Sequence, residues 1–529
     1  MARIRLKSDS TSKSVVFSTF FSLMARVFSF VQAMIVSYYF GATKSTDFLF
    51  FCVSMTLLLP GLFTNINKAV IVPNAIRLRE VNSEEESRRF ISYIYFLYLA
   101  AGIVVCAVIG LLPERFMLLV SKFNLADIRE NMLVVKMIIP VFFFILANYY
   151  LLDIFDSYKY FTFPMILDMI KSILTILVII FLGKRYGVVS MAAGILLSYA
   201  VQFIVLNGLM IKMLGFRFSF RAYHLDSILR KNMFYVVISQ VSSILSQYIA
   251  AYLISGQSEG VYTALSYSDR IYGIFSQVFA GQIATVLGIN MIEMYAKSQY
   301  EKLNEQYLKY LKVSMTVVLP ICFIMAAQAP QVISVLFERG SFTSSSVQLT
   351  SIFFRYTILI VPLLLLDSLI VRLIIARQIM RISFIWNVIS KLLTCIVIYI
   401  IVEHVGFAYY GLGLLLVQLV YIILLNFFMV KKYFQYIHVN ESLLYLAASV
   451  MLCTALSYIA GRVLPAGDIN GILRKIASLC TYSVLVMGGY FLIGYATYNR
   501  ETIRQLFRYL MQLLPGRFAL GVSQTDKLT

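Results

Sequence analysis

The chain has 529 residues, of which 60% are apolar and only 13% are charged, and its mean hydropathy is +0.83. Soluble domains are about half apolar and a quarter charged, so this composition excludes an ordinary soluble globule. The formal net charge of +20 would suggest nucleic-acid binding in a soluble protein. In a membrane protein basic residues gather in cytoplasmic loops instead, and we expect no nucleic-acid partner.

Apolar stretches of roughly twenty residues, long enough to cross a bilayer as a helix, recur along the chain. They predict an all-α, polytopic membrane protein with about fourteen transmembrane helices. The first stretch follows a basic segment but lacks a small-residue cleavage site, so we expect a retained helix rather than a signal peptide. The predicted spans are 15–40, 46–72, 90–112, 132–152, 164–183, 187–211, 232–254, 261–289, 308–328, 347–371, 382–402, 407–430, 441–461 and 472–498.

The distribution of lysine and arginine predicts the orientation of these spans. An even number of spans places both termini on one side of the membrane. Basic residues concentrate in the two terminal tails and in the loops on that same side, such as 77–89 and 212–231. Because positive residues favour the cytoplasmic face, we predict that both termini are cytoplasmic.

Two parts of the chain repeat one plan. The first two spans join through a short turn with Gly41 and Asp47, and a polar inner segment, 77–89, follows. The seventh and eighth spans do the same, with a turn at 255–260 and a second inner segment at 293–305. We expect both inner segments to lie along the membrane surface.

Such a repeat is typical of alternating-access transporters, whose site lies between two lobes. We therefore predict two six-helix lobes around a central cavity plus two extra C-terminal helices. The predicted parts are a cytoplasmic tail (1–14), an N-terminal lobe (15–211), a cytoplasmic linker (212–231), a C-terminal lobe (232–430), an extra helix pair (441–498) and a cytoplasmic tail (499–529).

Five cations lie within or beside the apolar stretches: Arg26, Lys68, Lys136, Arg270 and Arg355. A charge at bilayer depth costs about 2.5–3.5 kcal/mol, so several charges of one sign need a reason. A water-filled cavity that receives an anionic cargo is the simplest one.

Each of these cations has an alternative interpretation. Arg26 and Arg270 could be buried against a neighbouring carboxylate such as Asp269. The other three could snorkel to an interface. Asp168 and Lys171 share one helical face, and we expect them to neutralise each other.

Prolines and the absence of motifs limit the chemistry further. We expect Pro60-Gly61, Pro140 and Pro320 to kink or unwind their helices, as hinges or cavity walls do in transporters. The chain has no Walker loop, HExxH motif, convincing nucleophile triad or paired-carboxylate cleft. Its six cysteines are scattered singly, without metal-ligand spacing. We predict no enzymatic activity, no cofactor and no metal site.

Three groups of short motifs stand out along the chain. The first comprises ARVF at 25–28, FGA at 40–42 and TDF at 46–48. The second comprises YSDRIY at 267–272 and ATVL at 284–287. The third is LFERGSFT at 336–343. Together they resemble the MurJ/MviN family of lipid II flippases, within the multidrug/oligosaccharidyl-lipid/polysaccharide exporter superfamily. Their order and spacing within a chain of about fourteen spans give the resemblance its weight.

The resemblance implies that a lipid-linked sugar diphosphate crosses the bacterial cytoplasmic membrane by alternating access. By position, Arg26 and Arg270 match cavity arginines that engage the pyrophosphate, and Asp47 and Asp269 match acidic positions beside them. Guanidinium groups suit this cargo because they bind phosphate oxygens in bidentate fashion. Within the third stretch we interpret residues 338–340 as a glycine-closed turn rather than as ligands.

The chain also departs from the family pattern. Gln32 and Ala33 stand where the family has a second arginine and an acid, and LPGL at 59–62 replaces a region that carries an arginine pair. Either Lys68, Lys136 or Arg355 compensates, or the cargo's head group differs from lipid II.

The leading hypothesis is therefore a lipid II flippase. The alternatives are a flippase for O-antigen or exopolysaccharide units, a cation-coupled multidrug antiporter, and a non-transporting scaffold of cell-wall assembly. An antiporter for cationic drugs would need carboxylates within the membrane to bind its cargo. The predicted cavity is basic instead, which argues against this alternative. Expected partners are the lipid-linked saccharide and membrane lipids. A coupling ion and the proteins of cell-wall or polysaccharide synthesis are left open.

Overall fold

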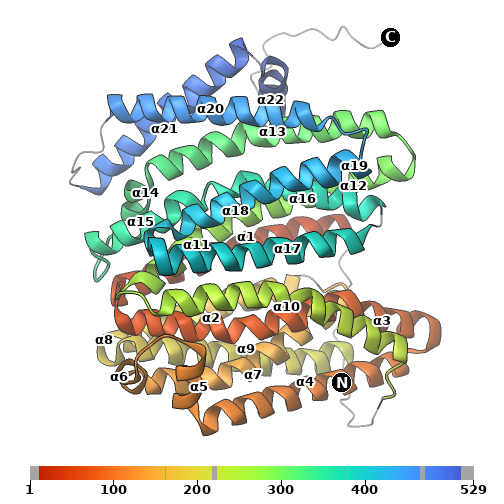
Figure 1. Cartoon of the computed structure of the whole chain (residues 1–529). Helices are drawn as coiled ribbons and strands as arrows, with labels where there is room; N and C mark the ends of the chain where they lie inside the picture. Colours follow the sequence, from red (N-terminus) through yellow and green to blue (C-terminus); the bar gives the residue numbers. More distant parts are fainter. Residues whose placement is uncertain are drawn as a thin grey trace. The chain divides into compact units, whose positions relative to one another are not determined.

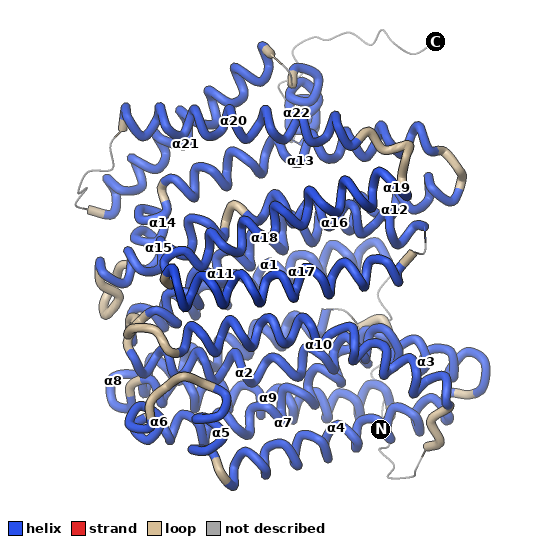
Figure 2. The backbone as a smooth tube through the Cα atoms, viewed as in Figure 1, coloured by secondary structure: helices blue, strands red, loops and turns tan. Residues whose placement is uncertain are grey.

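The computed structural model describes residues 11–160, 162–216, 223–377, 379–464, 471–497 and 499–513, and all regular structure in these ranges is helical (Figure 2). The all-α prediction is confirmed. The helices form two compact units. Unit 1 comprises Met1–Phe275, Ala329–Ile360 and Ile379–Tyr421, and unit 2 comprises Ser276–Gln328, Val361–Gln378 and Ile422–Thr529. The division into two consecutive six-helix lobes stays a prediction.

Unit 1 contains the first eleven α-helices and parts of the later chain (Figure 1). Its elements are α1 (Thr11–Phe40), α2 (Lys44–Ile66), η1 (Asn67–Ile71), α3 (Val72–Arg77), η2 (Leu78–Asn82), α4 (Glu84–Leu111), α5 (Pro113–Val120), α6 (Leu125–Glu130), α7 (Met132–Ser157), α8 (Thr162–Tyr186), α9 (Val188–Leu214), α10 (Ser227–Ser255), α11 (Val261–Ser276), α14 (Ala329–Phe337), α15 (Ser344–Thr357), α17 (Met380–Ile400), η4 (Ile401–Val405), η5 (Phe407–Tyr409) and most of α18 (Tyr410–Leu424).

Unit 2 holds the C-terminal helices together with two segments from the middle of the chain. Its elements are η3 (Gln277–Gln282), α12 (Ile283–Ala296), α13 (Tyr300–Ala327), α16 (Ile360–Arg377), η6 (Leu425–Val430), α19 (Lys431–Tyr433), α20 (Val439–Val463), α21 (Ile472–Ala496) and α22 (Arg500–Leu513). Within it α13 packs against α20, α21 and α22. Asn499, which precedes α22, donates hydrogen bonds to the hydroxyls of Thr316 (2.8 Å) and Tyr445 (2.9 Å).

The described chain contains 12 helical segments that are long and apolar enough to cross a membrane. This confirms a multi-pass membrane protein. The remaining two predicted spans, 15–40 and 261–289, are helical as well, as α1 and as the run from α11 to α12. Met24–Phe40 is apolar but shorter than the other spans. The count of fourteen therefore stays a prediction.

Neither inner segment is a separate surface helix, so that expectation is wrong. The second span continues without a break to Asn82, and the next helix begins two residues later. Ser83 caps α4 by accepting a hydrogen bond from the Glu86 N–H (3.1 Å), and three glutamates in the first turn favour a helix start there. The segment 293–305 is likewise divided between the end of α12 and the start of α13.

The core of unit 1 is formed where α2, α4, α7 and α9 pack together. Tyr150 of α7 is fully buried and donates a hydrogen bond to the Ile91 carbonyl of α4 (2.8 Å). On α9, a Cβ at Gly194 would lie 3.2 Å from a side chain of α8, which is the close packing that small residues allow between membrane helices. Lys171 Nζ lies 2.8 Å from Asp168 Oδ1, so their predicted pairing is confirmed.

Candidate functional site

Parts of all three family-like stretches meet at one end of unit 1, where α1 turns into α2. The loop after α14 reaches this turn: the Ser341 N–H donates to the Tyr38 carbonyl (2.8 Å), and its hydroxyl donates to the Tyr39 carbonyl (3.1 Å). We call the contacts among residues 38–47, 255–263 and 338–343 the turn seal.

Two glycines make the turn seal possible. Gly41 and Gly340 have φ angles of +62° and +59°, in the left-handed region that favours glycine. A Cβ at Gly41 would lie 2.3 Å from the Ser341 carbonyl oxygen, and one at Gly340 would lie 2.4 Å from that of Tyr38. A larger side chain at either position would push the two loops apart. The geometry agrees with the predicted glycine-closed turn at 338–340.

Asp47 anchors the start of α11 within the turn seal. Its two carboxylate oxygens accept hydrogen bonds from the backbone N–H groups of Gly260 and Thr263, both at 2.7 Å. The side chain is only 3% exposed. This differs from the expected place of Asp47 beside the cargo, because both of its oxygens are used to cap a helix that belongs to a distant part of the sequence.

Further polar contacts extend the seal around Asp47. The Lys44 N–H donates to Glu259 Oε1 (3.1 Å), and its ammonium lies 3.4 Å from Asp127 Oδ2. Lys122 donates through its backbone to the Ser255 hydroxyl (2.9 Å) and pairs with Glu403. The turn end of unit 1 is thus closed by polar contacts among five separate segments, namely 38–47, 122–127, 255–263, 338–343 and the one that contains Glu403.

An aromatic cluster lies directly beneath the turn seal. Tyr267 of α11 is fully buried, with its ring centroid 5.1 Å from that of Phe337 and 5.4 Å from that of Phe342. The ring of Phe30, on α1, lies 5.8 Å from that of Phe337. The cluster therefore joins α1 to α11 through the end of α14.

Arg26 and Arg270 each lie about one helical turn beyond this cluster. Arg26 is four residues before Phe30 on α1, and Arg270 is three residues after Tyr267 on α11, spacings that share a helical face. At 1.5 Å per residue, they lie roughly 22 Å and 15 Å along their helices from the turn end. A hydrocarbon core is about 30 Å thick, so both guanidinium groups are near its middle. Both predicted site residues therefore lie on the side of the aromatic cluster that faces away from the turn end.

The surroundings of Arg270 leave it available to a ligand. Its guanidinium lies 5.3 Å from the Phe50 ring centroid, a cation–π contact, and the side chain is half-buried. Asp269 is exposed, and the ion pairs within the described chain do not include one between it and Arg270. Arg26 is half-buried on α1.

Lys68 is held in a polar network that the sequence did not reveal. Its ammonium lies 3.8 Å from Asp153 Oδ1 on α7. The other oxygen of Asp153 accepts a hydrogen bond from the Asn67 amide (2.9 Å), whose carbonyl oxygen accepts one from the Tyr98 hydroxyl (2.8 Å). Lys68 therefore has a carboxylate partner, although its side chain is 64% exposed.

Arg355 and Lys136 are placed separately from these groups. Arg355 is exposed in the last turn of α15, and Lys136 is exposed near the start of α7. The position of Lys136 four residues into its helix suits the snorkelling alternative.

The helices continue through the predicted hinge residues. α2 contains Pro60 and Gly61, α7 contains Pro140 and α13 contains Pro320, and none of these helices ends at its proline. The helices do not unwind there, because neighbouring groups in a membrane bundle can satisfy the carbonyl that a proline leaves free. That they kink at these residues stays a prediction. The irregular turns of the second span are instead the wider π-helices at Asn67–Ile71 and Leu78–Asn82.

Comparison with known proteins decides the family. A family model described as "Lipid II flippase MurJ" matches residues 36–468. The chain belongs to the MurJ family. This match covers the turn seal and Arg270, whereas Phe30 and Arg26 lie before its start.

Individual relatives of the family are distant in sequence. The chain is 24% identical over 347 residues to a "Probable lipid II flippase MurJ" of Borreliella burgdorferi, which covers 64% of this chain and 66% of that protein. It is 23% identical over 389 residues to one from Buchnera aphidicola subsp. Baizongia pistaciae, which covers 68% of this chain and 71% of that protein. The chain thus spans about two thirds of the length of these relatives.

Solved structures share the fold. A structure of "Lipid II flippase MurJ, inward closed conformation" matches with a TM-score of 0.76 at 18% identity, over 91% of this chain and 99% of that chain. An inward-facing multidrug resistance MATE family transporter of the MOP superfamily matches with a TM-score of 0.63 at 17% identity, over 77% of this chain and 96% of that chain. The MurJ-type fold expected from the motifs is therefore confirmed.

Proposed function

We propose that this MurJ family member is a flippase that moves lipid II from the inner to the outer leaflet of the bacterial cytoplasmic membrane by alternating access. The observation that carries the proposal is that Arg26 and Arg270 each lie one helical turn beyond the aromatic cluster beneath the turn seal, at a depth near the middle of the membrane. Two guanidinium groups at that depth suit a diphosphate, whose oxygens they can bind in bidentate fashion.

The orientation follows from the charges at the two ends of unit 1. Arg77, Arg79, Arg88 and Arg89 lie around the junction of η2 and α4, at the other end of the second span from the turn seal. Positive residues favour the cytoplasmic face, so the turn seal faces outward and both termini are cytoplasmic. The cargo then enters from the inside while the seal is closed. Energy comes from the membrane potential or from a coupled ion.

Lys68, Lys136 and Arg355 are assigned a secondary role toward the cargo. The Lys68 ammonium already lies 3.8 Å from an Asp153 carboxylate oxygen. It should therefore contribute less binding energy to a diphosphate than Arg270 does. We therefore expect Lys68→Met to reduce transport less than Arg270→Ala does.

Complementation tests the proposal directly. In cells depleted of their own peptidoglycan-precursor flippase, the wild-type chain should restore growth, and Arg26→Ala or Arg270→Ala should not, although both variants insert in the membrane. Arg185→Ala is the matched control, because Arg185 is exposed at the end of α8. Growth supported by both cavity variants, or no growth with the wild type while an exopolysaccharide flippase mutant is rescued, would contradict the assignment.

A further inference from the structure

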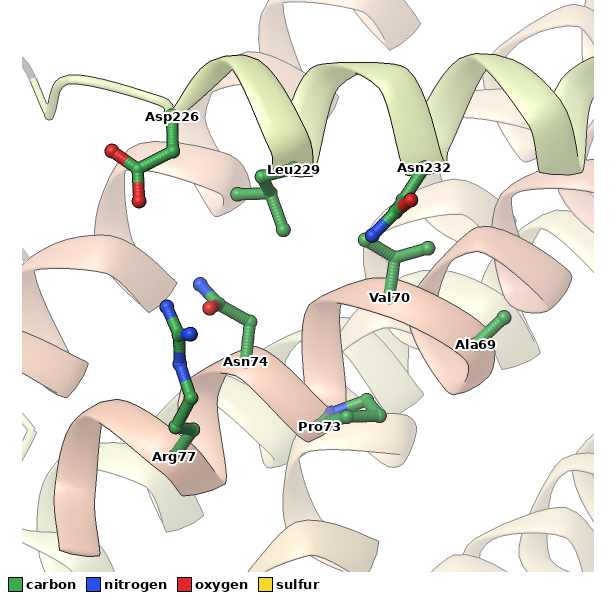
Figure 3. A pocket seen from close by; sticks show the side chains of 8 residues that line it. All are labelled: Ala69, Val70, Pro73, Asn74, Arg77, Asp226, Leu229 and Asn232. Atoms are coloured by element: carbon green, nitrogen blue, oxygen red, sulfur yellow. The ribbon is translucent and has the colours of Figure 1, made fainter. Parts of the chain in front are cut away.

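At the end of unit 1 opposite to the turn seal, a pocket of about 260 Å³ opens between α3 and the start of α10. Its apolar lining includes Val70, Pro73 and Leu229 (Figure 3). Val70 and Leu229 are buried and belong to the core of the unit. The pocket therefore lies between two helical segments of the core and not within a loop.

Polar groups of the two helices face each other across this gap. Asn74 and Arg77 project from α3, and Asp226 and Asn232 project from the start of α10 (Figure 3). Arg77 and Asp226 lie at the same end of the pocket, are both exposed and have opposite charges. The ion pairs within the described chain include neither of them.

Arg77 and Asp226 act on a common neighbour, Tyr223. Partial burial raises the pKa of the Tyr223 hydroxyl, Glu86 and Asp226 raise it further, and Arg77 lowers it. The Tyr223 hydroxyl donates to Glu86 Oε1 over 3.5 Å. The two opposite charges therefore act on the same hydroxyl group.

The gap lies beyond a point where the two helices touch. The Asn65 amide of α2 donates to Gln240 Oε1 of α10 (3.1 Å). Arg77 is 12 residues past Asn65 and Asp226 is 14 residues before Gln240, roughly 18–21 Å along their helices. In the other direction the second span and the segment after α10 are joined by Asp47 and Gly260. The helix pair is therefore joined at the turn end and at its middle, and the pocket lies between its two members beyond that point, toward the cytoplasmic end.

We propose that Arg77 and Asp226 form an ion pair that closes this pocket when the turn seal opens. We call this pair the inner latch. The inside and outside directions in this inference rest on the proposed function, since alternating access needs the cytoplasmic end closed whenever the outer end is open. A partly exposed ion pair is weak, so it can form and break in each cycle.

Charge reversal tests the inner latch in proteoliposomes with labelled lipid II. R77D and D226R should each slow flipping about fivefold or more, and the double variant R77D/D226R should recover to within about twofold of the wild type, the pattern of directly coupled residues. The matched control is E85R/R89E, which reverses the charges of an exposed ion pair on α4. The paired atoms lie 2.6 Å apart, and the reversal should leave the flipping rate unchanged. Additive loss in the double variant would overturn the latch.

A cross-linking measurement needs no cargo. In a background free of native cysteines, R77C/D226C is treated with a short bifunctional thiol reagent in membranes. The yield should rise several-fold when Asp47→Ala opens the turn seal. The same cross-linking yield with and without Asp47→Ala would refute the inner latch. If the yield responds but the wild type moves no lipid II, the latch holds and the cargo assignment fails.

A phospholipid head group is the other chemistry that could fit this pocket. If it fills the pocket, flipping by the charge-reversed variants should depend on the phosphatidylethanolamine content of the vesicles, and the double variant should not recover. That outcome would replace the latch with a lipid site.

Discussion

Replacing Asp47 with alanine removes both acceptors that hold the start of α11 in the turn seal. The Gly260 and Thr263 N–H groups donate to Asp47 at 2.7 Å, and its side chain is 3% exposed. A hydrogen bond to a charged group contributes roughly 1.5–3 kcal/mol, and part of the sum offsets the cost of burying the carboxylate, so we expect a net loss of about 3 kcal/mol for the sealed state.

This loss should appear as a shift in conformation rather than as unfolding. About 3 kcal/mol changes a two-state ratio roughly 150-fold, so a sealed-to-open ratio of about 99:1 would fall to about 40:60. The assay is labelling of Asp269→Cys, in a background without native cysteines, by a membrane-impermeant thiol reagent added from outside. Asp269 is exposed beside Arg270, beneath the seal. Asp47→Ala should raise the labelling rate by more than tenfold, in line with this shift.

The control for Asp47→Ala is Glu114→Gln. Glu114 is acidic and pairs with Arg129 at 3.0 Å, but it is not part of the turn seal. Its loss should leave labelling unchanged. Equal labelling of Asp269→Cys with and without Asp47→Ala would refute the view that these hydrogen bonds keep the outer end closed.

Two further outcomes follow from close contacts. Gly340→Ala should abolish flipping while the protein still inserts, because the new Cβ would lie 2.4 Å from the Tyr38 carbonyl oxygen. The control is Gly61→Ala, whose Cβ would meet nothing within 4 Å and which should be tolerated. Full flipping by Gly340→Ala would contradict the role of the turn seal. Asn499→Ala should lower the melting temperature in detergent by several degrees, because two buried hydroxyls lose a hydrogen-bond donor at a cost of about 1–3 kcal/mol. The control is Thr497→Ala, at an exposed residue, which should leave the melting temperature unchanged. Equal melting temperatures for the two variants would count against the stabilising role of the Asn499 hydrogen bonds.

The parts of the fold that depend on local sequence could be predicted. Apolar stretches of sufficient length must become helices in a membrane, and the left-handed turn at Gly340 is a local requirement of the chain. The pairing of Asp168 with Lys171 follows from a spacing of three residues on one helix. The two inner segments failed this test, because Ser83 lets α4 start only two residues after the second span ends.

The remaining features depend on contacts between distant residues, which composition does not reveal. Asp47 has the same chemistry whether it faces a cargo or caps α11, and only the fold places it beside Gly260. Asp153 lies one residue past a predicted span, with nothing local to connect it to Lys68. The effect of the prolines also depends on distant residues. Neighbouring helices decide whether the backbone hydrogen bond that a proline breaks leads to a hinge in its helix.

In the proposed mechanism, Arg26 and Arg270 together carry a lipid-linked diphosphate through the membrane. The decisive measurement is the rate at which fluorescent lipid II in proteoliposomes becomes accessible from outside, for the wild type, each single alanine variant and the double variant. We expect rapid transfer by the wild type, at least about a tenfold loss in each single variant and little further loss in the double one, as for two residues acting on one group. Transfer by the double variant at the wild-type rate would contradict it.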